Sequence, residues 1–284
     1  MTTTELKEFD MGKIAHTPHC NIVIIGKRNT GKSTLIKYIL YHIRLVVPLI
    51  MAMSGTERSN NFYKQFIPEI FVFDGMEIKK FGDVLERQLK IQEKVANKKR
   101  KYVGTNTNIS LVLDDCVDNT EWTKDDAIGY FTTNGRHVAL TFIVVTQESK
   151  KLPPTMRTNA DYIFISKTNG YTERKKIRDD YLGMITDKRE CDRIFQEYTK
   201  DYRFLVVDNV TRETGIKNQL FWCKADYNLK PILCDEAYWR LNTIIQRTIY
   251  NQLQKKEIEK HNLERSHPDY DEVYDKDDSR REPE

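Results

Sequence analysis

The feature that most constrains the fold of this chain is the segment at residues 26–33, Gly-Lys-Arg-Asn-Thr-Gly-Lys-Ser. It matches the phosphate-loop pattern G-x-x-x-x-G-K-[S/T] at every fixed position. An apolar run at residues 21–25 precedes the segment, and a helical pattern at residues 33–42 follows it. A loop of this kind binds phosphate when a strand delivers it to the amino end of a helix. The segment therefore predicts a strand–loop–helix unit that binds a nucleotide.

Each fixed position of the loop has a chemical reason. Gly26 and Gly31 allow the tight turns that present backbone N–H groups to phosphate oxygens. Lys32 places a positive charge against the β- and γ-phosphates, and the hydroxyl of Ser33 can bind Mg²⁺. We therefore predict ATP and Mg²⁺ as cofactors. The predicted nucleotide-binding residues are Gly26, Lys27, Arg28, Asn29, Thr30, Gly31, Lys32, Ser33 and Thr34.

Six further short apolar runs predict the other strands of a sheet. Several of them are apolar on both faces, which is typical of central strands covered by helices. Helical patterns at residues 81–98 and 172–182 alternate with these runs. Alternation of strands and helices favours an α/β fold with a mainly parallel sheet flanked by helices. The runs lie at residues 46–53, 109–113, 139–146, 162–165, 204–207 and 220–223.

Two acidic residues and an amide directly follow two of these predicted strands. Asp114 and Asp115 come after one strand, and Gln147 comes after another. In a nucleotide hydrolase, Asp114 would hold Mg²⁺ together with Ser33, and Asp115 would polarise the attacking water. The amide of Gln147 would contact that water and the γ-phosphate. The alternative is that these polar side chains only cap the ends of their strands.

Arginine side chains often stabilise the transition state of phosphoryl transfer, and a neighbouring subunit can supply them. Three arginines are candidates here. Arg28 lies inside the loop, Arg136 precedes the strand that ends at Gln147, and Arg157 precedes the run at residues 162–165. We predict that one of the three is catalytic.

The carboxyl-terminal part of the chain differs from the rest. Residues 266–284 carry eight acidic and three basic side chains, a net charge of −5, so the preceding residues carry about +9 within the total of +4. A basic folded part fits a polyanionic partner. Apolar residues recur at intervals of four after Asp235, which predicts an amphipathic helix that packs back on the domain. We expect a lead-in at residues 1–19, a phosphate-loop domain at residues 20–265 including this helix, and a disordered acidic tail.

The composition excludes several classes of protein. The longest apolar run, residues 45–53, contains Pro48 and is too short to span a bilayer, so no membrane insertion is expected. The amino terminus lacks the apolar stretch of a secretory signal. Five cysteines without regular spacing indicate a reducing compartment rather than a disulfide framework. We therefore expect a soluble intracellular protein.

The order and spacing of these motifs resemble the DNA-packaging ATPases of the large nucleocytoplasmic DNA viruses, whose poxvirus member is the best known. That family lies in the FtsK–HerA superfamily of RecA/ASCE-like P-loop NTPases. The resemblance covers about residues 20–226. Besides the phosphate loop, it rests on Leu113-Asp-Asp-Cys116, on residues 134–147, on residues 152–162 and on residues 204–225.

The resemblance implies a function and a set of roles. It implies an ATP-driven motor that moves double-stranded DNA, independently of sequence, into a capsid, with a homo-oligomeric ring and capsid components as partners. Asp114 would hold Mg²⁺, Asp115 would be the general base and Gln147 the sensor of the γ-phosphate. Arg136 or Arg157, rather than Arg28, would be the arginine supplied to a neighbouring subunit. The implied location is the cytoplasm of the infected host cell, in the virus factory, with association with the virion left open.

Two other functions remain open from the residues alone. The first is a kinase of nucleosides or nucleotides, which needs a pocket for the phosphate acceptor. The second is a nucleotide-dependent DNA-binding switch without useful turnover. The carboxylate pair and Gln147 favour water as the acceptor and turnover over switching.

Overall fold

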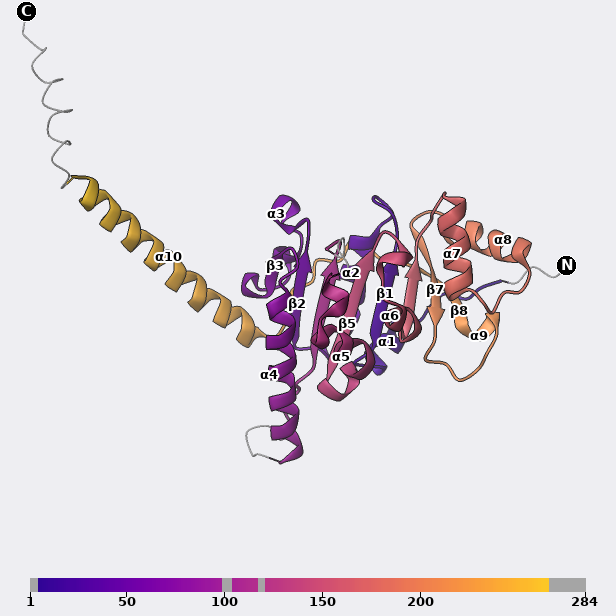
Figure 1. Ribbon diagram of the computed structural model, residues 1–284, viewed down its shortest axis with the longest axis horizontal. Coiled ribbons are helices and arrows are strands. Elements are labelled where there is room, and N and C mark those ends of the chain that lie inside the picture. Colours follow the sequence, from indigo (N-terminus) through magenta and orange to yellow (C-terminus); the bar gives the residue numbers. More distant parts are fainter. Residues whose placement is uncertain (1–4, 99–103, 117–120, 266–284) are drawn as a thin grey trace, which may run out of the picture. The chain divides into compact units, whose positions relative to one another are not determined.

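The structure is a computed structural model that describes residues 5–98, 104–116 and 121–265, with side chains up to residue 260. Its first compact unit, Met1–Asp235, is built around one eight-stranded sheet in the order β3-β2-β4-β5-β1-β6-β7-β8. Figure 1 shows this sheet with helices packed against it. The strands are β1 Asn21–Ile25, β2 Leu49–Ser54, β3 Val72–Asp74, β4 Ile109–Asp114, β5 Leu140–Thr146, β6 Tyr162–Ile165, β7 Arg203–Asp208 and β8 Leu220–Lys224.

The sheet is mainly parallel, as the alternation of strands and helices predicts. All pairs from β3 to β6 are parallel, whereas β7 pairs antiparallel with β6, and β8 pairs antiparallel with β7. The carboxyl ends of β4, β5, β1 and β6 therefore meet at one edge. This edge carries the phosphate loop and the polar residues that follow β4 and β5.

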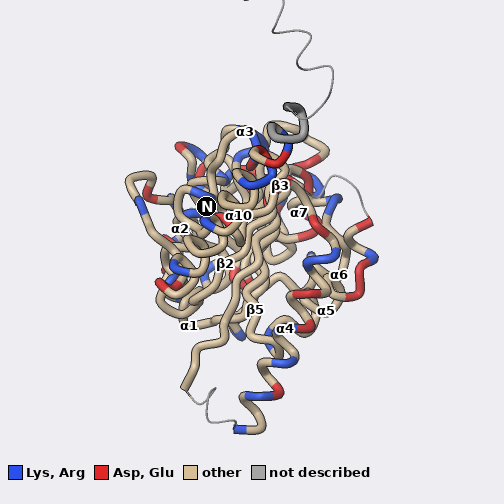
Figure 2. The backbone as a smooth tube through the Cα atoms, turned by 90° about the vertical axis from the view of Figure 1, so that its left-hand side faces the viewer, with Lys and Arg blue, Asp and Glu red and all other residues tan. Residues whose placement is uncertain are grey.

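Helices cover both faces of the sheet. Seen along the sheet in Figure 2, the strands lie between α1 and α2 on one side and α4, α5 and α6 on the other. Ile24 of β1 packs in one cluster with Ile36 of α2, and Phe142 of β5 contacts Phe131 of α5 with ring centroids 5.9 Å apart. The helices are α1 Gly12–His16, α2 Lys32–Ile43, α3 Glu57–Asn60, α4 Ile78–Ala96, α5 Asp126–Asn134, α6 Pro154–Thr158, α7 Tyr171–Tyr181, α8 Lys188–Tyr198, α9 Ile216–Gln219 and α10 Glu236–Arg265.

The seven predicted strands are present, and the helices predicted at residues 33–42, 81–98 and 172–182 are found as α2, α4 and α7. Their ends differ from the predicted ones by a few residues. β2 begins at Leu49 rather than at residue 46, because the chain makes turns after α2 up to Pro48. Pattern analysis did not predict β3, which has three residues and therefore no readable periodicity.

Residues 5–19, which precede β1, contact the sheet at β8. The backbone N–H of Phe9 donates to the carbonyl of Trp222 at 2.7 Å, and the N–H of Trp222 donates to the carbonyl of Lys7 at 3.0 Å. Leu6, Phe9 and Met11 are buried. Residues 5–19 thus pair with the edge of the sheet at β8 and contribute to its core, and the predicted boundary between residues 19 and 20 stays a prediction.

The predicted carboxyl-terminal helix is present as α10, which belongs to a second compact unit, Glu236–Glu284. Several of its apolar side chains are exposed, including Leu241, Ile244 and Leu253. That this helix packs on the domain stays a prediction, and the predicted disordered tail lies outside the described residues. Within the part of the chain that is described, no helix is long and apolar enough to cross a membrane.

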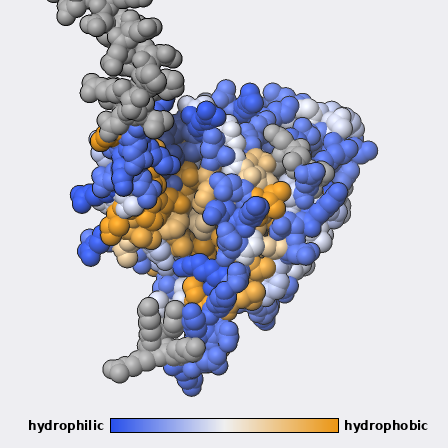
Figure 3. Space-filling model, turned by 60° about the vertical axis from the view of Figure 1, so that its left-hand side comes forward, coloured by the Kyte–Doolittle hydropathy of each residue, from blue (hydrophilic) through white to orange (hydrophobic). Residues whose placement is uncertain are grey.

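The surface of the protein is predominantly polar. Figure 3 shows one face on which charged and polar side chains surround an area of apolar side chains. Single exposed apolar residues such as Leu45, Tyr227 and Ile232 occur outside α10 as well. Exposed apolar residues of this kind are usual for globular domains.

Candidate nucleotide-binding site

The phosphate loop connects β1 to α2 at the edge where the parallel strands end. A Cβ added to Gly26 would lie 2.2 Å from Oγ of Ser166 and 2.8 Å from Oγ1 of Thr30, so a side chain there would clash. Gly31 has a φ of +89°, in the left-handed region that glycine adopts without strain. The neighbouring side chains at Gly26 and the left-handed backbone at Gly31 therefore favour glycine at both positions, in agreement with the phosphate-loop pattern.

Lys32 is held inside the loop. It is the first residue of α2, its side chain is buried, and its Nζ donates a hydrogen bond to the carbonyl oxygen of Lys27 at 2.9 Å. Burial lowers the pKa of this ammonium group, and the carboxylates of Asp115 and Asp114 partly oppose that shift. A desolvated cation beside free N–H groups at a helix start is a strong site for a phosphate group.

Ser33 and Thr34 occupy the first turn of α2, where the backbone N–H groups have no helical partner. The side chain of Ser33 is exposed at this end of the helix. The predicted loop residues therefore lie together around the amino end of α2.

Asp114 is the last residue of β4 and is buried. Its Oδ2 accepts a hydrogen bond from the hydroxyl of Tyr63 at 2.9 Å. A carboxylate from Asp114, the hydroxyl of Ser33 and oxygens from water and phosphate would form the all-oxygen, octahedral ligand set that Mg²⁺ prefers. The residues present therefore fit Mg²⁺, with most of its ligands coming from the nucleotide and water.

Asp115 and Gln147 contact each other although 32 positions separate them in the sequence. Nε2 of Gln147 donates to both carboxylate oxygens of Asp115, at 2.9 and 2.8 Å. Asp115 has a φ of +52°, so the strand has ended and the carboxylate stands on the turn after Asp114. The structure thus brings together the two residues that sequence analysis predicts as general base and sensor.

The environment of Asp114 predicts a pH dependence. Burial, the largest influence, raises the pKa of this carboxyl from 3.8 to about 6, against the opposing hydrogen bond from Tyr63. Protons and Mg²⁺ compete for the carboxylate of Asp114, so we expect the Mg²⁺ concentration that gives half the maximal hydrolysis rate to rise as the pH is lowered through about 6. The raised pKa also means that ionising Asp114 destabilises the folded protein. The free protein should therefore gain stability from this group as the pH falls from about 6 toward 3.8.

Two measurements check this prediction. The Mg²⁺ concentration that gives half the maximal hydrolysis rate is recorded from about pH 5 to about pH 8, a range that spans the raised pKa. The free energy of unfolding is recorded against pH for the native chain and for Asp114→Asn. In Asp114→Asn, the free energy of unfolding should not show the change between about pH 6 and pH 3.8 that Asp114 causes in the native chain. If the free energy of unfolding depends on pH identically in both proteins, the pKa of Asp114 is not raised.

Two functional residues were not predicted from the sequence. Tyr63, which holds Asp114, is fully buried in the segment between β2 and β3. The carboxylate of Glu57, also buried, accepts from the backbone N–H groups of Tyr63 and Lys64 at 3.1 and 3.2 Å and so fixes that segment. No local pattern marks either residue, because each acts on partners that only the fold brings close.

We expect Tyr63→Phe to weaken the response to Mg²⁺ while the fold is kept. The change removes one hydroxyl and leaves the ring in the core, so Asp114 loses the hydrogen bond that fixes its orientation. The Mg²⁺ concentration that gives half the maximal hydrolysis rate should rise by about threefold to tenfold, the worth of one such bond. Tyr171→Phe, at an exposed tyrosine, is the control and should leave this concentration unchanged.

Neither of the two favoured arginines lies at the phosphate loop of its own chain. Arg136 forms an ion pair with Asp161, at 3.6 Å, near the amino ends of β5 and β6, which is the opposite edge of the sheet from the loop. Arg157 of α6 pairs with Asp180 of α7 at 2.8 Å. Arg28 is exposed on the loop itself. A catalytic arginine supplied to a neighbouring subunit stays a prediction.

Comparisons with known protein sequences place this site in a family. The model of the family described as Poxvirus A32 protein matches residues 6–181. The uncharacterized protein 088R of Invertebrate iridescent virus 3 is 33% identical over 235 residues, which cover 80% of this chain and 87% of that protein. The uncharacterized protein L437 of Acanthamoeba polyphaga mimivirus is 32% identical over 222 residues, covering 78% of this chain and 77% of the relative.

Solved structures share the fold at low sequence identity. ATPases 2 and 3 of EssC from Geobacillus thermodenitrificans superpose with a TM-score of 0.52 and 14% identity, covering 82% of this chain and 45% of that chain. B204, the DNA-packaging ATPase from Sulfolobus Turreted Icosahedral Virus, is 21% identical with a TM-score of 0.48, covering 74% of this chain and 98% of that chain. The chain thus shares the fold of this EssC structure. Because the family model matches more than half of the chain and both viral relatives match it along most of their length, this chain belongs to the family of the poxvirus A32 protein, as its motifs predict.

Proposed function

We propose that this chain is an ATP-hydrolysing motor that translocates double-stranded DNA into a viral capsid. The observation that carries the proposal is the cluster of Lys32, Asp115 and Gln147 at the edge of the sheet where the phosphate loop lies. A buried cation for the phosphates beside a carboxylate and an amide fits hydrolysis with water as the acceptor. Membership in a viral family and the charge of about +9 before the tail support a polyanionic cargo.

The chain's own residues have separate tasks in this mechanism. The backbone N–H groups of the loop and Nζ of Lys32 bind the phosphates. Asp115 takes the proton of the attacking water at one carboxylate oxygen, and the amide of Gln147 holds that carboxylate and can turn to the water. Asp114 and Ser33 would hold Mg²⁺, which when bound neutralises charge on the phosphates.

Translocation requires more than one subunit in this proposal. A homo-oligomeric ring would form the channel for DNA and would let one subunit supply Arg136 or Arg157 to the site of its neighbour. We further propose that the protein acts with capsid components, without membrane insertion, in the cytoplasm of the infected host cell.

A kinase of nucleosides and a switch without turnover are the competing functions. One experiment separates all three: ADP formation, phosphate release from ATP and DNA binding are measured with Mg²⁺ alone, with added long duplex DNA and with added nucleosides. The proposal expects release without an acceptor and a faster rate with DNA. ADP formation that depends on added nucleoside and releases no phosphate indicates a kinase, because the γ-phosphoryl group is then transferred to the nucleoside. DNA binding without ADP formation indicates a switch.

We expect DNA binding to depend steeply on salt and weakly on sequence. No base-reading motif was found in the sequence, so the contacts would be made to the phosphate backbone. The logarithm of the affinity should fall by about 0.9 per neutralised phosphate for each unit of log salt concentration. Filter-binding or fluorescence anisotropy at several salt concentrations measures this slope. An affinity that ignores salt, or that strongly prefers one sequence, would contradict a backbone-driven contact.

A further inference from the structure

The positions of the proposed catalytic residues indicate how a bound nucleotide would be oriented along the edge of the sheet. Asp114 ends β4, and Asp115 and Gln147 follow β4 and β5, so in the proposed function the γ-phosphate and the metal would lie on that side of the loop. In the sheet, β1 separates these strands from β6 and β7. Because neighbouring strands lie about 4.8 Å apart, a nucleotide with its phosphates along the loop would extend its sugar and base toward β6 and β7.

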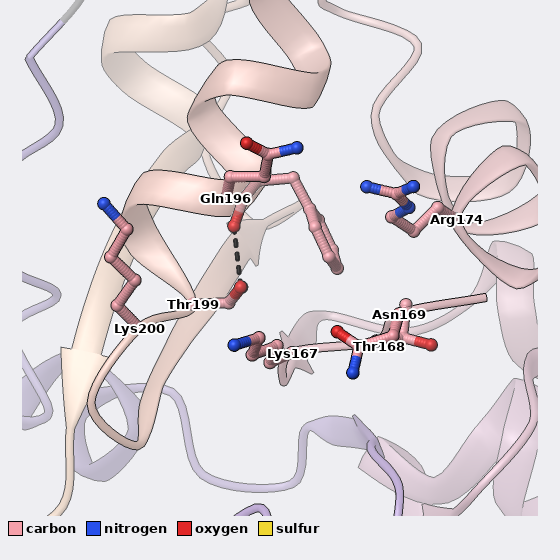
Figure 4. A pocket seen from close by; sticks show the side chains of 8 residues that line it. Lys167, Thr168, Asn169, Arg174, Gln196, Thr199 and Lys200 are labelled. Carbon is pink, nitrogen blue, oxygen red and sulfur yellow. Dashed lines mark hydrogen bonds between the residues drawn. The ribbon is translucent and has the colours of Figure 1, made fainter. Parts of the chain in front are cut away.

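Two cavities lie on that side. The first, here called the loop cavity, has a volume of about 270 Å³ and is lined by Asn29 and Thr30 of the loop and by Asp201 and Tyr202. The second, here called the outer cavity, has a volume of about 390 Å³ and is drawn in Figure 4. Lys167 and Thr199 line both, so the two cavities adjoin each other and lead away from the phosphate loop.

The outer cavity has the chemistry of a site for a heteroaromatic base. Arg174, near the start of α7, points its guanidinium into the cavity and faces the segment at residues 167–169 (Figure 4). The ring of Phe195 and the amides of Asn169 and Gln196 also line it, whereas none of the described residues that line it is acidic. Planar cations and aromatic rings stack on bases, and amides supply both donors and acceptors for a base edge.

Buried polar atoms beside the outer cavity lack partners. The hydroxyl of Thr168, a residue that is 7% exposed, and Nε of Arg174 have no hydrogen-bond partner among the described residues. Such atoms are rare in folded proteins and mark places where a ligand or water completes the structure.

Tyr202, at the loop cavity, is held in an unusual conformation. Asp201 and Tyr202 have φ values of +51° and +61°, in the left-handed region that bulky side chains rarely adopt. The ring of Tyr202 is 67% exposed, and a Cβ at Gly31 would lie 3.4 Å from its Cδ1. The fold thus keeps the aromatic ring of Tyr202 exposed to solvent and next to the phosphate loop. Strained backbone conformations of this kind often occur at ligand-binding sites.

We propose that these two cavities bind the nucleoside of ATP. The sugar lies in the loop cavity against Tyr202, where the carboxylate of Asp201 accepts hydrogen bonds from its hydroxyls, and the base lies in the outer cavity against Arg174. This inference rests on the proposed function, because it requires that the loop binds the triphosphate. It also assigns Arg174 to nucleotide binding.

Binding of two ligands to the full chain tests the proposal. Calorimetry with Mg²⁺ measures the affinities of ATP and of inorganic tripolyphosphate, which has the phosphates but no nucleoside. The test variants are Arg174→Gln and Tyr202→Asn, since asparagine tolerates the left-handed backbone. Lys175→Gln, one position further along α7 and exposed, and Tyr227→Asn, at a tyrosine that is 77% exposed, are the matched controls.

We expect each test variant to bind ATP about fivefold or more weakly, the worth of one stacking contact, and to bind tripolyphosphate as the controls do. Intact tripolyphosphate binding also demonstrates that a variant is folded. A loss of ATP affinity no larger than in the controls, or an equal loss for tripolyphosphate, overturns the proposal. Photolabelling with 8-azido-ATP should mark peptides that contain residues 167–174 or 195–202, and labelling only elsewhere overturns it as well.

Lys32→Ala distinguishes this failure from that of the proposed function. The variant should weaken the binding of both ATP and tripolyphosphate. If it weakens neither, the loop does not bind the phosphates, and both the function and the nucleoside site are wrong. If it weakens both while Arg174→Gln and Tyr202→Asn behave as their controls, only the nucleoside site is wrong.

Discussion

Lys32→Ala is expected to abolish ATP hydrolysis and to weaken the binding of ATP. The change removes the buried ammonium that faces the β- and γ-phosphates, and with it charge-assisted hydrogen bonds worth about 1.5–3 kcal/mol each. The affinity for ATP should therefore fall by about tenfold or more, and turnover by at least about 10²-fold, since the same charge stabilises the transition state. Equilibrium binding and single-turnover hydrolysis measure the two effects.

The fold should survive this substitution. Nζ of Lys32 donates to the carbonyl oxygen of Lys27, and burial already disfavours its charge. Removing a desolvated charge that contributes little to stability leaves the core intact. Lys37→Ala, one turn further along α2, is the control and should hydrolyse ATP at the native rate. Native turnover in Lys32→Ala would show that the loop is not the nucleotide site.

Asp115→Asn is expected to keep ATP binding and to lose hydrolysis. Asparagine preserves the size of the side chain and adopts the left-handed backbone at φ +52° readily, so the turn after β4 is retained. What is lost is the carboxylate that accepts the proton of the attacking water. Turnover should fall by about 10²–10⁴, the usual contribution of a positioned general base, while the affinity for ATP changes by less than about tenfold.

Asp114→Asn is the matched comparison, because it makes the same chemical change one residue earlier. It should lose both hydrolysis and the response to Mg²⁺, whereas Asp115→Asn should keep the response to Mg²⁺ in its ATP binding. Both variants are compared for ATP affinity and single-turnover rate at saturating Mg²⁺. Hydrolysis by Asp115→Asn at the native rate would mean that the base lies elsewhere and that Asp115 only caps the strand.

Local sequence patterns predicted most of the secondary structure around the site. The pattern of residues 26–33 requires a strand before it and a helix after it, and β1 and α2 are found there. The apolar runs predicted β4, β5 and β6 because the side chains of central strands are buried on both faces. The polar residues after β4 and β5 could be placed at one edge because parallel strands end together.

Local sequence patterns did not predict the position of the amino-terminal residues or of Arg136. The amino-terminal residues showed no periodicity, yet Phe9 lies in the core because β8 offers an edge for backbone hydrogen bonds. Arg136 is close to Gln147 in the sequence but not in space. The seven residues of β5 lie between them, so the two side chains are at opposite edges of the sheet.

The sequence by itself determined the phosphate loop, since the left-handed turn at Gly31 and the charge of Lys32 are local properties of eight residues. Only the tertiary structure decided which side chains meet around that loop: Gln147 with Asp115, and Tyr63 with Asp114 from 51 positions away. The physical reason is that backbone conformation depends on sterics between neighbouring residues. Contacts between distant residues instead depend on the order in which strands pair, and that order follows from the burial of the whole core.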